Sequence, residues 1–123
     1  MSPLKTEIQG KVATLTLNRP AQMNTIDLGM AKALYEASLS FTEHSTVRAL
    51  IITGAGEKAF CAGGDLAAFN QHGEALGEHL HEVTHYLHGA ISRFARMTLP
   101  VITAVNGVTA GGGLAFLGFP QLV

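Results

Sequence analysis

The sequence predicts an α/β fold, because short apolar runs typical of buried strands alternate with longer segments whose apolar residues recur at helical spacing. The chain has 123 residues, of which 47% are hydrophobic and 14% charged, so it is long enough for one domain with a modest core. A formal net charge of −1 provides no basic field for nucleic acid, and we expect no nucleic-acid partner.

The N-terminal part of the chain contains one predicted strand and one predicted helix. Residues 11–17 alternate apolar and polar side chains, which indicates a half-buried strand, and Gln9-Gly10 before them suits a hairpin turn. Asp27 suits the N-cap of a helix that runs to about Thr42, since the apolar residues of this segment recur at helical spacing.

The middle of the chain predicts two more strands around a long helix. Residues 47–53 form an apolar run typical of a buried strand, and we expect a loop from Gly54 to Gly64. Residues 76–97 place their large apolar side chains on one face of a helix. Residues 100–105 then predict a third core strand.

Two glycine-rich segments, residues 60–66 and 110–114, each follow a predicted strand. Glycine has no Cβ, so it lets a ligand oxygen approach the main chain closely and tolerates unusual φ values. Two N–H groups aimed at one oxygen can hold the negative charge that develops on a thioester carbonyl. Two unrelated tight turns are the alternative, and the joint occurrence of the segments favours a shared site in an acyl-CoA enzyme.

Several segments occur in an order that can be compared with known families. They are Asn18-Arg19-Pro20 with residues 23–26, followed by residues 49–54, 60–66, 99–107 and 111–113. Together they resemble the N-terminal part of the enoyl-CoA hydratase/isomerase, or crotonase, family from about Ile8 to about Leu114. The resemblance implies that residues 1–123 are the N-terminal portion of a single crotonase-like core domain. It also implies a spiral of β-β-α units that is incomplete at its C-terminus, without the C-terminal helical region used in trimerisation.

The resemblance also implies a site. It assigns the backbone N–H groups of Gly64 and Gly112 to an oxyanion hole for the enolate of an acyl-CoA thioester. Gly112 also lies at the start of a short predicted helix, residues 114–118, whose unpaired N–H groups and dipole favour an anion. The main-chain groups that contact the thioester arm or the adenine are, by resemblance, those of Ala62, Asp65, Leu66 and Ala67, with Met23 near the nucleotide end. Asp65 has an alternative role as the N-cap of the next helix. No separate cofactor is implied, because coenzyme A is part of the substrate.

The acid/base group is not assigned by the sequence. Ala115 stands where hydratases of the family carry a glutamate that handles a water proton, and the position of a second glutamate lies beyond Val123. Two functions therefore stay open: an enoyl-CoA hydratase/isomerase-type enzyme with its base elsewhere, or a catalytically silent acyl-CoA-binding pseudo-enzyme or truncated fragment. The family implies a homo-oligomer, a trimer or a dimer of trimers, for the complete protein.

A zinc metalloprotease is a minor alternative. His81-Glu82-Val83-Thr84-His85 matches the pattern H-E-x-x-H on a predicted helix, where histidines four residues apart can share a metal ion. No separate third ligand stands out in the sequence, so we favour a solvated helix face and expect no metal. Cys61 is the only cysteine, which excludes an internal disulfide, and we expect it to have a packing role.

The termini give further expectations. The first residues lack an apolar run of signal-peptide length, and the apolar stretches fall well short of a membrane span. We therefore expect a cytoplasmic protein with no membrane partner. Residues 121–123 suit the start of a strand, and an unfinished sheet exposes an edge and an apolar face. We expect a fragment or truncated reading frame that is poorly stable in isolation.

Overall fold

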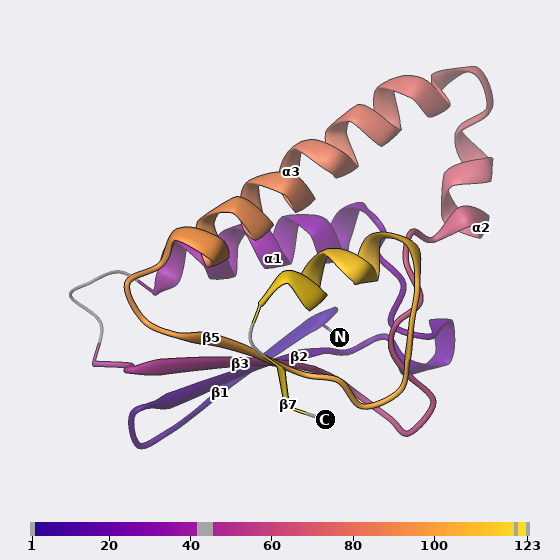
Figure 1. Cartoon of the computed structure of the whole chain (residues 1–123). Helices are drawn as coiled ribbons and strands as arrows, with labels where there is room; N and C mark the ends of the chain where they lie inside the picture. Colours follow the sequence, from indigo (N-terminus) through magenta and orange to yellow (C-terminus); the bar gives the residue numbers. More distant parts are fainter. Residues whose placement is uncertain (1, 42–45, 120, 123) are drawn as a thin grey trace.

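The computed structural model describes residues 2–41, 46–119 and 121–122. In these residues a five-stranded sheet carries two long helices on one face (Figure 1). The strands of this sheet, in spatial order, are β1 (Leu4–Gln9), β2 (Val12–Leu17), β3 (Ala49–Gly54), β5 (Val101–Ala104) and β7 (Gln121–Leu122). β1 is antiparallel to β2, and the other neighbouring strands are parallel. A mostly parallel sheet with helices in its connections confirms the predicted α/β class.

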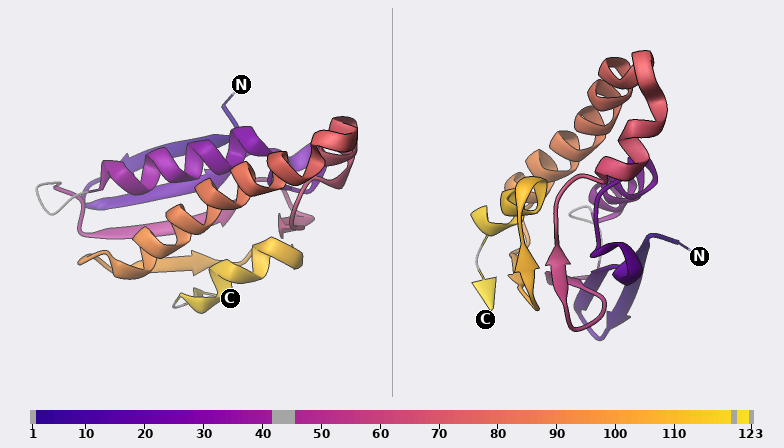
Figure 2. Two further views of the ribbon diagram at one scale, coloured as in Figure 1. Left: turned by 90° about the horizontal axis from the view of Figure 1, so that it is seen from above. Right: turned by 90° about the vertical axis from the view of Figure 1, so that its right-hand side faces the viewer.

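The long helices, α1 (Leu28–Ser40) and α3 (Leu76–Arg96), lie side by side over the sheet, as the left view of Figure 2 shows. Shorter elements connect them to the strands. These are α2 (Leu66–Phe69), the 3₁₀ helices η1 (Pro20–Gln22), η2 (Asn70–Ala75) and η3 (Gly111–Gly118), and a two-stranded parallel sheet of β4 (Ala59–Cys61) and β6 (Val108–Thr109).

The hairpin and the first helix follow from local sequence. Gly10 has a φ of +63°, which allows the tight turn between β1 and β2 and confirms the predicted hairpin. Asp27 accepts a hydrogen bond from the Met30 N–H at 2.8 Å, so it is the N-cap that the sequence predicts for α1. The helix ends at Ser40, and the expected end at Thr42 lies outside the described residues.

The helices and strands after α1 agree in part with those that the sequence predicts. The predicted long helix is confirmed as α3, and the strands expected at 47–53 and 100–105 are confirmed as β3 and β5. The loop expected from Gly54 to Gly64 is wrong in one respect, because it contains β4. Three residues are too few to show a period, so only the pairing of β4 with β6 identifies this strand. The short helix expected at 114–118 is a 3₁₀ helix that begins earlier, at Gly111.

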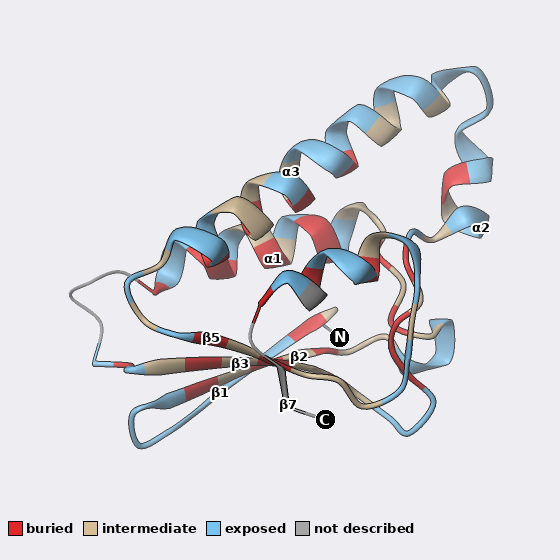
Figure 3. Cartoon of the chain, in the orientation of Figure 1, coloured by how far each residue is buried: buried red, intermediate tan, exposed pale blue. Residues whose placement is uncertain are grey.

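The core lies between the sheet and the helices. Figure 3 shows buried residues along the strands and on the sides of α1 and α3 that face the sheet. The small sheet and η3 close one end of this core, where Phe60 and Phe116 pack edge to face with ring centroids 5.7 Å apart. Among the described residues, no helix combines the length and apolar character needed to cross a membrane.

Candidate functional site

The first glycine-rich segment lies between two other segments of the chain. On one side, residues 61–65 run beside residues 23–26, and Gly64 pairs with Ile26 in an isolated parallel bridge. The hydrogen bonds on this side run from Ala62 N to Met23 O (3.1 Å), from Ile26 N to Gly63 O (2.7 Å) and from Asp65 N to Ile26 O (3.0 Å). The turn before α1 therefore fixes the main chain on both sides of Gly64.

The second glycine-rich segment packs on the other side of residues 61–65. β4 continues into this contact, because the Ala110 N–H donates to the Cys61 carbonyl at 3.1 Å. Gly63 has a φ of +105°, and a Cβ there would lie 3.1 Å from the Ala110 carbonyl oxygen and 3.4 Å from the Gly112 nitrogen. A Cβ on Gly113 would overlap the Cys61 carbonyl oxygen. The two glycine runs are thus in direct backbone contact, at a closeness that only glycine permits.

The orientation of the Gly64 N–H follows from its peptide plane. The described residues contain no cis peptide bond, so the Gly64 N–H points opposite to the Gly63 carbonyl. That carbonyl accepts from Ile26, and the Gly64 N–H therefore points away from residues 23–26. Residues 61–65 have their other neighbour, the second glycine run, on the opposite side.

The N–H groups of Gly64 and Gly112 find no acceptor among the described residues. Gly64 is exposed and Gly112 is half-buried. Gly112 lies in the first turn of η3, where Gly113 already donates to the Ala110 carbonyl at 2.9 Å. Orphan N–H groups in a first turn are available to an external acceptor and carry the positive end of the helix dipole. The structure therefore leaves at least one available donor in each glycine run, with Gly64 in the first and Gly112 in the second.

Asp65 has the N-cap role that the sequence left as an alternative. Its Oδ1 accepts from the Ala68 N–H at 3.0 Å at the start of α2. Its main-chain N–H and carbonyl are both used within the protein, by Ile26 and Phe69 respectively. The Ala68 hydrogen bond, followed by that of Arg19, holds the pKa of this carboxyl below its ordinary value.

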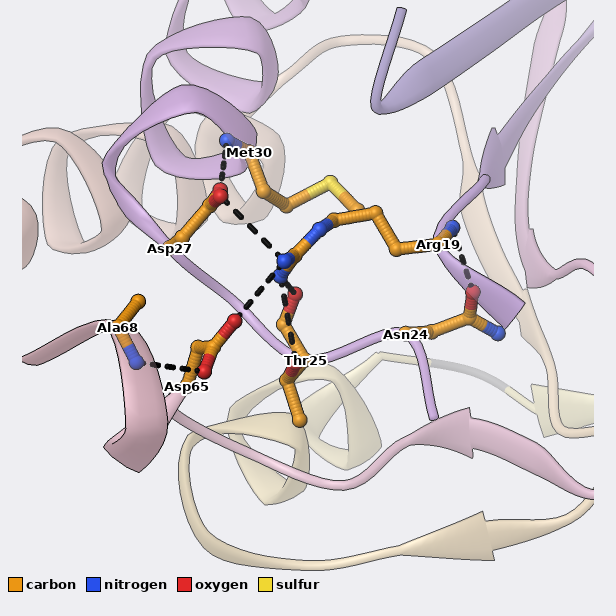
Figure 4. A network of polar contacts seen from close by, with 7 residues as sticks. All are labelled: Arg19, Asn24, Thr25, Asp27, Met30, Asp65 and Ala68. Carbon is orange, nitrogen blue, oxygen red and sulfur yellow. Dashed lines mark hydrogen bonds and ion pairs between the residues drawn. The ribbon is translucent and has the colours of Figure 1, made fainter. Parts of the chain in front are cut away.

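Arg19 joins the two capping aspartates, as Figure 4 shows. Its Nη2 lies 2.8 Å from Asp65 Oδ2 and 3.5 Å from Asp27 Oδ2. Its Nη1 donates to the Thr25 carbonyl at 2.7 Å, with the Thr25 hydroxyl at 3.2 Å. Sequence reasoning missed this arrangement, and the signal for it was one arginine followed by two potential N-cap aspartates.

Asn24 is a second residue that sequence reasoning missed. It is fully buried with a φ of +54°, a conformation that asparagine tolerates better than most residues. Its amide donates to the carbonyls of Ala55 (3.0 Å) and Ala59 (2.9 Å), and its Oδ1 accepts from the Arg19 N–H at 2.9 Å. Asn24 therefore ties the turn before α1 to the segment that leads into β4.

The remaining predicted contact residues lie around this centre. Met23 has a φ of +56°, and its N–H and carbonyl are both used by main-chain partners, Pro20 and Ala62. Leu66, with 71% of its surface exposed, and the exposed Ala67 form the first turn of α2, directly after the Gly64 loop. The structure thus brings these residues to the same edge of the molecule as the glycine runs.

Two other features of the sequence are Cys61 and the H-E-x-x-H pattern of residues 81–85. Cys61 is fully buried, and burial raises the pKa of its thiol, which agrees with a packing role. His81 and His85 are exposed on α3, and Glu82 lies 3.9 Å from Lys32 in a surface ion pair. In the part of the chain that the structure describes, no three histidine, cysteine or acidic side chains gather in a way that could hold a metal ion.

Comparison with known proteins identifies the family of this chain. The family model described as enoyl-CoA hydratase/isomerase matches residues 12–119. The chain is 36% identical over 108 residues to the mitochondrial 3-hydroxyisobutyryl-CoA hydrolase of Danio rerio, covering 85% of this chain and 28% of the hydrolase. It is 37% identical over 114 residues to the 1,2-epoxyphenylacetyl-CoA isomerase of Escherichia coli (strain K12), covering 92% of this chain and 43% of the isomerase.

A solved structure gives the same result for the fold. The crystal structure of an enoyl-CoA hydratase from Bacillus anthracis matches with a TM-score of 0.84 at 30% identity, covering 93% of this chain and 43% of that one. The likeness confirms the expected crotonase-like fold. The chain spans less than half the length of each of these three proteins. The family model matches most of this chain, and the chain shares its fold with the solved hydratase. The chain therefore belongs to the enoyl-CoA hydratase/isomerase family.

Proposed function

We propose that this chain supplies the oxyanion hole of an acyl-CoA enzyme, formed by the backbone N–H groups of Gly64 and Gly112. The observation that supports this most directly is the contact between the two glycine runs, together with the N–H groups of Gly64 and Gly112, which have no acceptor among the described residues. The thioester carbonyl oxygen would lie between these donors. As negative charge develops on that oxygen, preorganised N–H groups stabilise it without reorganisation.

The substrate class follows from the chemistry that such a site recognises. A pair of N–H donors selects for a carbonyl that becomes an enolate or a tetrahedral oxyanion, and a thioester carbonyl does both. The relatives named above are a CoA-thioester hydrolase and a CoA-thioester isomerase, which have this carbonyl in common. We therefore propose an acyl-CoA substrate and a reaction of the hydratase/isomerase type, without a choice of acyl group.

The contacts to the rest of the substrate are proposed from position. Ala62, Leu66 and Ala67 flank the Gly64 loop, where Leu66 and Ala67 are exposed, and we propose that they contact the pantetheine arm or the adenine, with Met23 near the nucleotide end. Asp65 contributes differently, because its carboxylate caps α2 and pairs with Arg19. Its carboxylate supports the loop rather than the ligand.

The proton-transfer group is proposed to come from elsewhere than Ala115. This residue is exposed in η3, and its methyl group can neither accept nor donate a proton.

The trimeric assembly and the cytoplasmic location expected from the sequence also stay predictions, and the Danio rerio hydrolase is named as mitochondrial.

The test compares two substitutions at Gly112 in the complete gene product. Gly112→Ala keeps the N–H, and its Cβ would be in ordinary contact with Leu87 Cδ2 at 3.7 Å and Ile26 Cδ1 at 4.0 Å. Gly112→Pro removes the N–H at a first-turn position, where proline is tolerated in helices. Turnover of a short enoyl-CoA and of a 3-hydroxyacyl-CoA is measured, together with circular dichroism and acyl-CoA affinity.

We expect Gly112→Pro to lower kcat on the order of 100- to 1,000-fold, the typical cost of one lost oxyanion donor, while the alanine variant stays close to wild type. Equal losses in both variants would contradict the assigned role of the N–H, because a steric effect would then explain them. Acyl-CoA binding by the wild-type protein without any turnover would support the silent alternative instead.

A further inference from the structure

The main chain that follows Gly64 is held through Asp65. The Asp65 N–H donates to the Ile26 carbonyl at 3.0 Å, and its carboxylate accepts from Ala68 N–H and from Arg19 at 3.0 and 2.8 Å. Only 12% of the Asp65 side chain and 17% of the Arg19 side chain are exposed. A charge-assisted hydrogen bond that is shielded from solvent restricts geometry far more than a surface ion pair does. The residue that follows Gly64 is therefore fixed in place mainly by Arg19 and the start of α2.

The partner strand of the Gly64 bridge is held by the same guanidinium. Arg19 donates to the carbonyl of Thr25, the residue before Ile26. Ile26 in turn uses its N–H on the Gly63 carbonyl and its carbonyl on the Asp65 N–H. Arg19 thus contacts a residue next to each member of the parallel bridge: the main-chain oxygen of Thr25, before Ile26, and the carboxylate of Asp65, after Gly64 (Figure 4).

We propose that Arg19 is a positioning residue that sets the direction of the Gly64 N–H, an inference that rests on the proposed oxyanion role of Gly64. The planar guanidinium donates from two nitrogens at once, to the Thr25 carbonyl on one side of the bridge and to the Asp65 carboxylate on the other. A lysine ammonium is a single point charge, so it can stay near Asp65 but cannot also donate to the Thr25 carbonyl with the same geometry. The bridge would then rotate or slip, and the Gly63–Gly64 peptide plane would turn with it.

The test uses two variants of the complete gene product that keep the local charge or cap. Arg19→Lys keeps the positive charge, and Asp65→Asn keeps an N-cap acceptor for α2 while it weakens the pair with Arg19. Arg96→Lys is the matched control, because among the described residues the Arg96 side chain bonds only to Ser92, one turn earlier on α3. Circular dichroism and melting temperature verify that each variant is folded.

The readout is the carbonyl stretching frequency of butyryl-CoA labelled with ¹³C at the thioester carbonyl and bound to each protein. Two aimed N–H donors lower this frequency in the wild type. We expect Arg19→Lys and Asp65→Asn to lose the part of this shift that is due to the Gly64 N–H and to lower kcat about 10- to 100-fold, with a much smaller change in KM, since small misplacement of a catalytic group has costs of this size. Arg96→Lys should keep both values.

The outcomes separate this inference from the proposed function. If Gly112→Pro loses the frequency shift but Arg19→Lys and Asp65→Asn retain it, Gly64 is positioned without Arg19 and only the present inference is overturned. If the wild type shows no shift and Gly112→Pro changes nothing, the oxyanion role itself is refuted and the inference with it. Loss of stability in Arg19→Lys with an unchanged carbonyl frequency would identify Arg19 as structural only.

Discussion

Gly113→Ala is the sharpest test of the contact between the two glycine runs. A Cβ on Gly113 would overlap the Cys61 carbonyl oxygen and lie 3.0 Å from Cys61 Cβ. Both neighbours belong to β4 and cannot rotate away, so the main chain itself must shift. Forcing an extra carbon into a packed site costs about 1–3 kcal/mol. If the strands separate, loss of the hydrogen bond from Ala110 to Cys61 adds about 0.5–1.5 kcal/mol.

The adjacent glycine provides the control for this prediction. Gly112→Ala places its Cβ at ordinary contact distances of 3.7 and 4.0 Å, so we expect little change in the free energy of unfolding. Urea unfolding of the two variants measures the difference, and hydrogen exchange of peptides spanning residues 108–113 shows where it arises. Equal stability of the two variants, with the Ala110 N–H still protected in Gly113→Ala, would refute the close approach of η3 to β4.

Two further predictions concern titratable groups. Because the pKa of Asp65 is lowered in the folded protein, its contribution to stability is present above the ordinary carboxyl pKa of about 3.9 and is lost as the pH falls through the lower folded value. Asp65→Asn should therefore lose less stability than wild type on acidification, as urea unfolding at several pH values would show, and parallel curves would contradict this. Cys61 is fully buried with a raised pKa, so iodoacetamide at neutral pH should modify it much more slowly in the native protein than in urea. Equal rates would mean that β4 is open to solvent.

The long, periodic elements were predictable because their determinants are local. The alternation in β2, the apolar face of α3 and the Asp27 cap each depend on residues within a few positions of one another. β4 was not predictable on the same basis. Its three residues are all buried, and they form a strand only because β6, from a later part of the chain, lies beside them.

The sequence named residues for a candidate site, and it could not give their geometry. The two glycine runs indicate where a ligand can approach the main chain, and Asp65 was identified as a possible N-cap. The roles of Arg19 and Asn24 were not visible, because each depends on partners from other parts of the chain as well as on nearby ones: Asp65 for Arg19, and Ala55 and Ala59 for Asn24. A charged or amide side chain in a turn is usually solvated, so the two aspartates after Arg19 were only a weak signal for its role.

The sequence by itself therefore determined the local elements, the glycine positions and the family to which the chain belongs. Only the tertiary structure decided which N–H groups are available and in which direction they point. The physical reason is that a planar peptide is oriented by the acceptor or donor on its far side. For Gly64 that partner is Ile26, in the turn before α1.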